Sequence, residues 1–210
     1  MDLLKKISKE AELLFKKFGI RSVTMSDIAQ KMGISKKTLY QNISNKNDLI
    51  QAMMLEHIED TRSACIKIKK SSTHALEAFL QLSIYVQEQI NDINPVLLYD
   101  LQKYHRDIWQ MLNDFQRNEI QQLILDNINR GISEGLYRAD VNAELISRIY
   151  TGFLPILSDL DLFPSESFPT AILYKEFIKY HINGILSEKG KDIMRDWENN
   201  STIFNPIQTK

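Results

Sequence analysis

Residues 22–50 constrain the fold of this chain more than any other stretch, because they predict two short helices joined by a tight turn. Thr24 is placed to cap the first helix, and Asp27, three residues later, completes a capping-box pattern. Gly33 stands where that helix ends and where the backbone needs a left-handed residue. Ser35 then opens the second helix as its N-cap. This spacing predicts a helix-turn-helix unit, whose second helix is able to enter the major groove of DNA.

The second helix of the unit, expected over 36–43, has an apolar inner side and a polar outer side. Leu39 and Ile43 are expected on the inner side. Lys36 and Lys37 lie at the helix N-terminus, where they oppose the helix dipole, so local helix stability does not explain them. Contacts with phosphates or with guanine edges would explain them. The plainer alternative is a solvated lysine pair on an ordinary helix.

Candidate DNA contacts follow from this placement. The side chains expected to reach base edges or the adjoining phosphates are Lys36, Lys37, Thr38 and Gln41. Those expected to position the unit on the DNA backbone are Ser22, Thr24, Ser35, Tyr40 and Lys46. Arg21 and the Lys5–Lys6 pair are expected to add weaker electrostatic contacts.

Charge is distributed unevenly along the 210 residues. Residues 1–50 hold 10 Lys and Arg against 5 Asp and Glu, a net charge of +5. Residues 51–210 hold 16 against 22, a net charge of −6, so the overall charge of −1 hides the asymmetry. A basic head on an acidic body is typical of a protein whose head binds a polyanion.

Residues 7–50 resemble the N-terminal DNA-binding domain of the TetR family of one-component transcriptional regulators. The matched positions are Ile7, Ala11, Phe15, Gly19, Thr24, Ile28, Ala29, Gly33, Ile34, Ser35, Leu39, Tyr40, Lys46 and Leu49. Ile43 and Asn47 depart from the family pattern, which has an aromatic residue and an acid there, and Asn42 replaces a frequent His. The resemblance implies a dimer, most often a repressor, that leaves a palindromic operator when a small-molecule inducer binds.

The rest of the chain predicts helices separated by short breaks. Their expected spans are 2–18, 44–69 (or 45–69), 74–91, 95–102, 105–134, 142–161 and 169–187. Pro155 is expected to kink one of them, and the last 14 or so residues are expected to be mobile. With only 7 glycines and 5 prolines, the chain favours an all-α fold. We expect a helix-turn-helix domain over 1–46, joined by a linking helix to a larger helical ligand-binding and dimerisation domain over 47–210.

The helices expected over 142–161 and 169–187 are apolar on more than one face. A helix that is apolar around much of its circumference needs burial on two sides. One side can pack on its own body and the other on a second copy, and a unit that reads a palindrome needs a twofold partner. We therefore expect a homodimer through these two helices. The alternative is a monomer that buries both faces in its own core.

Amphipathic aromatic residues are frequent in the middle of the chain. The family resemblance implies an inducer pocket among these helices, and apolar walls with a few polar tips suit a small organic ligand. The candidate lining residues are Tyr85, Tyr99, Tyr104, Trp109, Phe115, Tyr150 and Phe153. A set like this is also what an ordinary helical core contains.

Other function classes find less support in the sequence. An enzyme would need a nucleophile with a base, a metal cluster or a phosphate-binding glycine loop, and no such arrangement is recognisable, so we expect no catalysis, metal or cofactor. Cys65 stands alone, no secretion signal opens the chain, and no run approaches the roughly 18–20 apolar residues of a membrane helix, so we expect a cytoplasmic protein. The alternatives left open are a DNA-binding adaptor whose body docks a protein and, with less support, a helical carrier or enzyme that binds no DNA.

Overall fold

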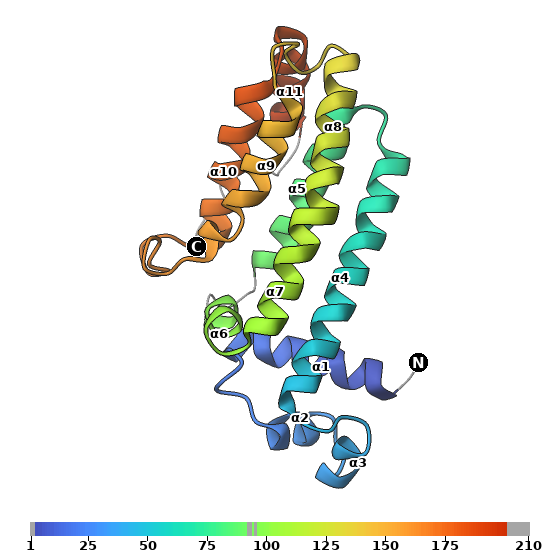
Figure 1. The fold of residues 1–210 in the computed structure, drawn as a ribbon, viewed down its shortest axis with the longest axis vertical. Coiled ribbons are helices and arrows are strands. Elements are labelled where there is room, and N and C mark those ends of the chain that lie inside the picture. The colour runs from blue at the N-terminus through green and yellow to red at the C-terminus, as the bar shows by residue number, and fades with distance from the viewer. Residues whose placement is uncertain (1–2, 92–93, 95, 201–210) are drawn as a thin grey trace.

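The computed structural model describes residues 3–91, 94 and 96–200, which form helices and connecting turns without a β-strand (Figure 1). The N-terminal helices are α1 (Leu3–Phe18), α2 (Met25–Lys31), α3 (Lys36–Tyr40) and α4 (Lys46–Ser71). The body contains α5 (Ala75–Asn91), α6 (Val96–Tyr104), α7 (Arg106–Phe115), the π-helical turn η1 (Gln116–Ile120) and α8 (Gln121–Ser133). It ends with α9 (Ala143–Phe153), the 3₁₀ turn η2 (Ile156–Ser158), α10 (Thr170–Ile185) and α11 (Glu188–Asn200).

The helix-turn-helix unit forms as its caps predict. The Thr24 hydroxyl accepts the amide of Asp27, and the Asp27 carboxylate accepts the amide of Thr24, which completes the capping box. Gly33 adopts φ +65°, the left-handed conformation that ends α2. Ser35 then accepts the amide of Thr38 at 3.0 Å and starts α3. Regular helix stops at Tyr40, so α3 is shorter than the expected span of 36–43.

Helix α4 connects two hydrophobic clusters. The head cluster holds buried residues of α1–α4 and also of α6 and α7, so that Leu49 and Ile58 of α4 share it with Leu101 and Leu112. The body cluster gathers residues of α5 and α8–α11 and takes in α4 at Cys65. Because the head cluster extends into the body helices, no gap in packing separates 1–46 from 47–210, and that boundary stays a prediction.

The middle of the body differs from the single helix expected over 105–134. Helices α7 and α8 continue one another through the π-helical turn η1, where the hydrogen-bonding pattern widens by one residue (Figure 1). The helix expected over 142–161 ends at Phe153 rather than bending at Pro155. Pro155 precedes the short turn η2, because proline cannot continue the hydrogen-bond ladder.

Helix α11 was missing from the sequence-based prediction. Of the last 14 or so residues, expected to be frayed or mobile, 197–200 belong to this helix, and residues 201–210 lie outside the described residues. Helix α11 is strongly polar, but it buries Met194 and packs Ile193 and Trp197 against the body cluster. These three apolar residues at helical spacing decide its position.

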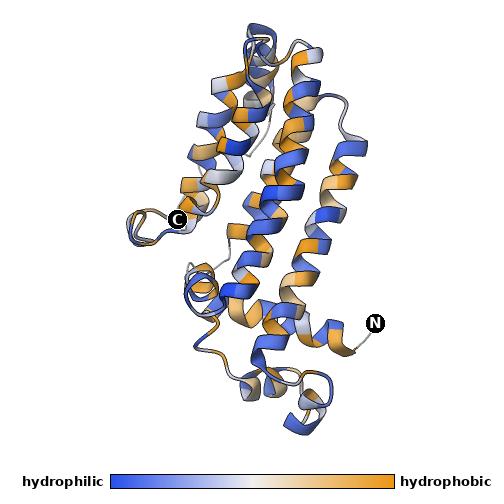
Figure 2. Ribbon diagram, viewed as in Figure 1, coloured by the Kyte–Doolittle hydropathy of each residue, from blue (hydrophilic) through white to orange (hydrophobic). Residues whose placement is uncertain are grey.

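Helices α9 and α10 leave apolar side chains uncovered, and apolar residues recur along both helices in Figure 2. We call this surface the α9–α10 face; its exposed members are Leu145, Ile149, Phe153, Ile156, Ile172 and Tyr180. Ile149 and Ile172 are each 59% exposed. Contiguous exposed apolar side chains mark contact surfaces, whereas single ones are ordinary.

Replacing Gly33 with Ala tests the turn between α2 and α3. A methyl group there would meet no atom within 4 Å, so its whole effect comes from the positive φ. We expect the free energy of unfolding, measured by urea titration of circular dichroism, to fall by about 1–2 kcal/mol. Gly33→Asn is the matched control and should lose less, since asparagine tolerates this conformation. An alanine variant as stable as the parent would contradict the turn.

Candidate nucleic-acid interface and ligand cavity

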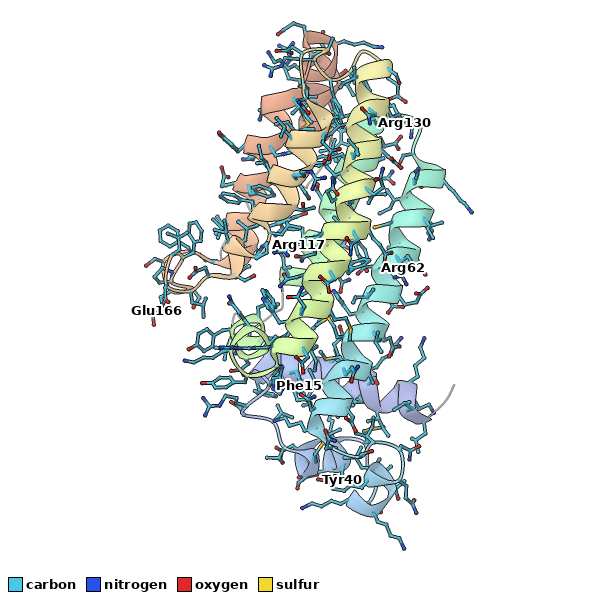
Figure 3. The ribbon with its side chains drawn as sticks, viewed as in Figure 1. Phe15, Tyr40, Arg62, Arg117, Arg130 and Glu166 are labelled. Carbon is cyan, nitrogen blue, oxygen red and sulfur yellow. The ribbon has the colours of Figure 1, made fainter. Side chains whose placement is uncertain are left out.

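Helix α3 presents the residues predicted to read DNA at the end of the molecule farthest from the body, where Figure 3 labels Tyr40. Lys36, Lys37, Tyr40 and Gln41 are exposed, whereas Thr38 is half-buried. Neither lysine forms an ion pair with any described residue, so both ammonium groups are available to an anion. Leu39 is fully buried beneath them and fixes this face outward.

Hydroxyl groups expected at the DNA backbone also hold the unit together. The Thr24 hydroxyl donates to the Asp27 carboxylate at 2.8 Å, and hydrogen bonds from Thr24 lower the pKa of Asp27. The hydroxyls of Ser35 and Thr38 lie 2.8 Å apart at the start of α3. Ser22 is exposed in the turn between α1 and α2. Thr24 and Ser35 therefore have a structural task that does not depend on DNA.

Lys46 clamps the turn between α1 and α2. Its ammonium group donates to the carbonyl oxygens of Ile20 at 2.6 Å and Val23 at 2.5 Å, and it lies 5.7 Å from the centre of the Phe15 ring. Burial lowers its pKa, while the nearby carboxylate of Asp100 acts in the opposite direction. Two of its three donors are thus used within the protein, so Lys46 positions the head before it meets DNA.

Arg21 faces helix α6. Its guanidinium group lies 4.8 Å from the centre of the Tyr104 ring and donates to the Tyr104 hydroxyl at 3.2 Å. Its backbone amide donates to the carboxylate of Asp100, which is buried. Nearby, the Asn47 side chain and the His105 ring nitrogen are 2.8 Å apart. These contacts attach the head to α6 and the start of α7.

A cavity of about 190 Å³ lies in the body, between the helices that contact the head and those that form the α9–α10 face. It is lined by His57 and Thr61 of α4, Leu82, Tyr85, Val86, Gln89 and Ile90 of α5, Leu98 of α6, Leu112 and Phe115 of α7, Gln116 and Ile120 of η1, Tyr150, Leu154, Leu157 and Ser158 of α9 and η2, and Thr170 and Tyr174 of α10. No Asp, Glu, Lys or Arg stands among these described lining residues. Its walls are therefore apolar with neutral polar tips.

Three of the predicted pocket residues, Tyr85, Phe115 and Tyr150, line the cavity, and their contact with a ligand stays a prediction.

Four predicted pocket residues lie elsewhere, because periodicity did not reveal which aromatic faces inward. Tyr99 accepts a hydrogen bond from Lys103, and Tyr104 belongs to the contact with Arg21. Trp109 packs on the head cluster. Phe153 stacks on Phe177 at the α9–α10 face, with ring centres 5.3 Å apart.

Sequence reasoning missed two cavity residues with chemical character. His57 lies on α4, and burial lowers its pKa, so its ring is neutral at pH 7. Tyr174 on α10 is 3% exposed, and no described residue meets its buried hydroxyl in hydrogen-bonding geometry. The sequence offers a weak signal for Tyr174, since a tyrosine in a strongly apolar helix needs a partner for its hydroxyl.

Known transcriptional regulators are similar to this chain in sequence and in fold. The family model of bacterial regulatory proteins of the tetR family matches residues 7–53, which contain α2, α3 and the start of α4. YvaF of Bacillus subtilis, an uncharacterized HTH-type transcriptional regulator, is 29% identical over 189 residues, covering 90% of this chain and 98% of YvaF. The DNA-binding segment of this chain therefore matches the tetR family, and the chain is similar to a transcriptional regulator along most of its length. It is a helix-turn-helix transcriptional regulator.

Other transcriptional regulators match over most of the chain as well. The transcriptional repressor KstR2 of Mycobacterium tuberculosis is 25% identical over 141 residues, covering 66% of this chain and 70% of KstR2. Its solved structure, described as a ketosteroid transcriptional regulator, has a TM-score of 0.62 at 19% identity, over 89% of this chain and 96% of that one. A TetR-family regulator of Agrobacterium tumefaciens has a TM-score of 0.71 at 15% identity, over 88% and 97%. These structures show the same fold.

Neither a membrane-spanning helix nor a metal-binding cluster occurs among the described residues. None of their helices is long and apolar enough to span a membrane. They also contain no group of three or more His, Cys, Asp and Glu side chains placed to hold a metal ion.

Replacing Lys46 with Ala tests the clamp. The carbonyl groups of Ile20 and Val23 would lose a charged donor, so we expect urea titration to show the free energy of unfolding reduced by about 1–3 kcal/mol. Lys36→Ala is the control: it removes an exposed lysine and should change stability by no more than about 0.5 kcal/mol. Equal effects of the two substitutions would show that the clamp does not stabilise the head.

Proposed function

We propose that this TetR-family regulator is a dimeric repressor that binds a palindromic operator through α3 and leaves it when a small molecule fills the body cavity. The observation that carries the DNA-binding part is the surface of α3. A firmly capped helix there presents Lys36, Lys37 and Gln41 to solvent with no ion-pair partner for the lysines among the described residues. Charged donors reach phosphates, and the Gln41 amide can pair with a base edge.

The proposed boundary between the two functional parts lies at the start of α4. Residues 1–46 act as the DNA-binding domain, and residues 47–210 bind ligand and dimerise. The roles proposed for Lys36, Lys37, Thr38 and Gln41 are contacts with bases and adjoining phosphates. Ser22, Thr24, Ser35 and Tyr40 position the DNA backbone, and Lys46 and Arg21 act mainly by holding the unit in place.

The α9–α10 face is proposed as the dimer interface. It offers several exposed apolar side chains on two adjacent helices, and two such helices from each copy would form a four-helix contact. Gly152 and Gly184 lie on these helices with open space around them, which allows close approach of a partner. A twofold dimer then carries two copies of α3, as a palindrome requires.

Ligand control is supported by the position of the cavity. Its wall contains His57 of α4, Gln89 of α5 and Leu98 of α6. The Gln89 side chain accepts a hydrogen bond from Lys16 of α1 at 3.4 Å. A ligand that moves these helices would move the head with them, because α6 also holds Arg21. The relative KstR2 is named a transcriptional repressor, and its structure is described as that of a ketosteroid transcriptional regulator. Control by an organic ligand is consistent with these names.

In vitro selection of bound duplexes from a random pool tests the function. We expect enrichment of a palindromic site, and failure to enrich any sequence would contradict the proposal. Repeating the selection with Gln41→Ala should broaden the base preference at one position of each half-site, since one bidentate base contact is worth about 1–3 kcal/mol. An unchanged profile would remove Gln41 from base reading.

Salt titration of the selected complex tests the phosphate contacts. With four or five neutralised phosphates per copy, the slope of log affinity against log salt should be roughly −7 to −9 for the dimer. Lys37→Ala removes one contact per copy and should reduce the slope by about 2. Lys31→Ala, at the exposed end of α2, is the matched control and should leave the slope unchanged. An unchanged slope for Lys37→Ala would show that Lys37 makes no phosphate contact.

Replacing Ile149 with Glu tests the dimer interface. We expect light scattering to give twice the 24.5 kDa chain mass for the parent and a shift toward the monomer for the variant, because a carboxylate would be desolvated at the contact. Ile66→Glu is the control, since Ile66 is similarly exposed at 50% but lies on α4. A variant at Ile149 that dimerises like the parent would contradict the interface.

A further inference from the structure

The hydroxyl of Tyr174 is an unusual feature of the cavity wall. Tyr174 is 3% exposed, and its hydroxyl oxygen is buried without a hydrogen bond. The polar groups beside it are the hydroxyls of Tyr150 and Ser83. Ser83 already donates its proton to the Phe79 carbonyl at 2.8 Å. A buried hydroxyl without a partner loses its bonds to water and gains nothing in return, which is destabilising unless another molecule completes it.

Tyr150 and Tyr174 together can supply a donor to a guest. Both residues line the cavity, and each phenol has a single proton. If the two hydroxyls turn toward each other, their mutual contact uses one proton and leaves the other for the Ser83 oxygen or for a guest. Burial raises the pKa of Tyr150 to about 12 and that of Tyr174 well above its usual value, so both stay protonated. The pair is therefore a hydrogen-bond donor at every pH near neutrality.

The rest of the wall excludes a formal charge. None of the described lining residues is Asp, Glu, Lys or Arg, and His57 is neutral because burial lowers its pKa. A carboxylate or an ammonium group would leave water without a countercharge to receive it. The cavity is larger than an apolar cavity of roughly 150 Å³ that holds benzene, so there is room for a ring with a short side chain.

We infer that the cavity takes an uncharged, mainly apolar molecule whose carbonyl or hydroxyl oxygen accepts a hydrogen bond from Tyr174. This inference deepens the ligand control proposed above, and rests on it, by assigning the chemical class of the effector and the residue that selects it. The apolar body of the ligand lies against the aliphatic and aromatic lining. The single polar oxygen of the ligand then accepts the proton of the Tyr174 hydroxyl, one of the buried polar groups without a hydrogen bond among the described residues.

Calorimetric titration of the full chain with a matched set of probes tests the assignment. The set is 4-phenylbutan-2-one, 4-phenylbutan-2-ol, butylbenzene, 4-phenylbutanoate and 4-phenylbutylammonium, which share a phenyl ring and a four-carbon chain. We expect the ketone and the alcohol to bind at least about tenfold more tightly than the two charged probes. Tyr174→Phe should weaken ketone binding about tenfold and butylbenzene binding less than twofold, because only the ketone loses a hydrogen bond.

Tyr137→Phe is the control for removing a buried tyrosine hydroxyl elsewhere in the body. Tyr137 is 2% exposed, but its hydroxyl donates to Asn127 and it does not line the cavity. This variant should bind every probe as the parent does. Retention of duplex binding by Tyr174→Phe would show that the variant is folded.

Three results would overturn the assignment. The first is a charged probe that binds as tightly as the ketone, and the second is an equal loss of affinity for ketone and butylbenzene in Tyr174→Phe. The third is a chain that still selects its duplex but binds no neutral probe. The last result would leave the DNA-binding function standing. If the chain binds the ketone through Tyr174 but selects no duplex, the assigned ligand class stands and the proposed DNA-binding function fails.

Discussion

Helix α4, which is 26 residues long, begins at an ammonium group held by two backbone carbonyls and ends beside the body cluster. Between these points it contributes Leu49, Met53 and Ile58 to the head cluster and Cys65 to the body cluster. One helix is thus packed at both ends, which is the arrangement that a shift of packed helices would use to connect the body with the head. In the proposed function, the orientation of α3 follows from what α4 contacts in the body.

Charge is used differently on the two sides of the head. Towards solvent, α3 leaves Lys36 and Lys37 without ion pairs among the described residues. Towards the body, Arg21 and Lys46 are held by carbonyls, an aromatic ring and the buried carboxylate of Asp100. The unpaired ammonium groups of α3 are available for phosphates, whereas the cationic groups of Arg21 and Lys46, which are hydrogen-bonded within the protein, fix geometry. Some of the positively charged side chains of residues 1–50 are thus available to bind DNA, and others hold the head in shape.

Local rules were sufficient to predict the helix-turn-helix unit. The roles of Thr24, Gly33 and Ser35 depend on hydrogen bonds and backbone angles within four residues, so the sequence alone contains them. The cavity was only partly predictable from the sequence. Tyr85, Tyr99, Tyr104 and Tyr150 are all tyrosines on helices, and only the direction in which each side chain faces decides that Tyr85 and Tyr150 line the cavity. Tyr174 and His57 come from helices far apart in the chain, and only tertiary packing brings them to one wall. Helix α11 was missed because three apolar contacts outweigh its polar composition.

The central claim is that two copies of this chain present their α3 helices to successive major grooves. Pulsed electron paramagnetic resonance on a Cys65→Ser, Ser44→Cys chain, spin-labelled beside α3, measures the separation directly; Ser44 is exposed and Cys65 is buried. Bound to its selected duplex, the chain should give one narrow distance distribution near the roughly 34–36 Å of one helical turn of DNA. No interlabel distance, or a distribution that the duplex leaves broad and unchanged, would contradict the account.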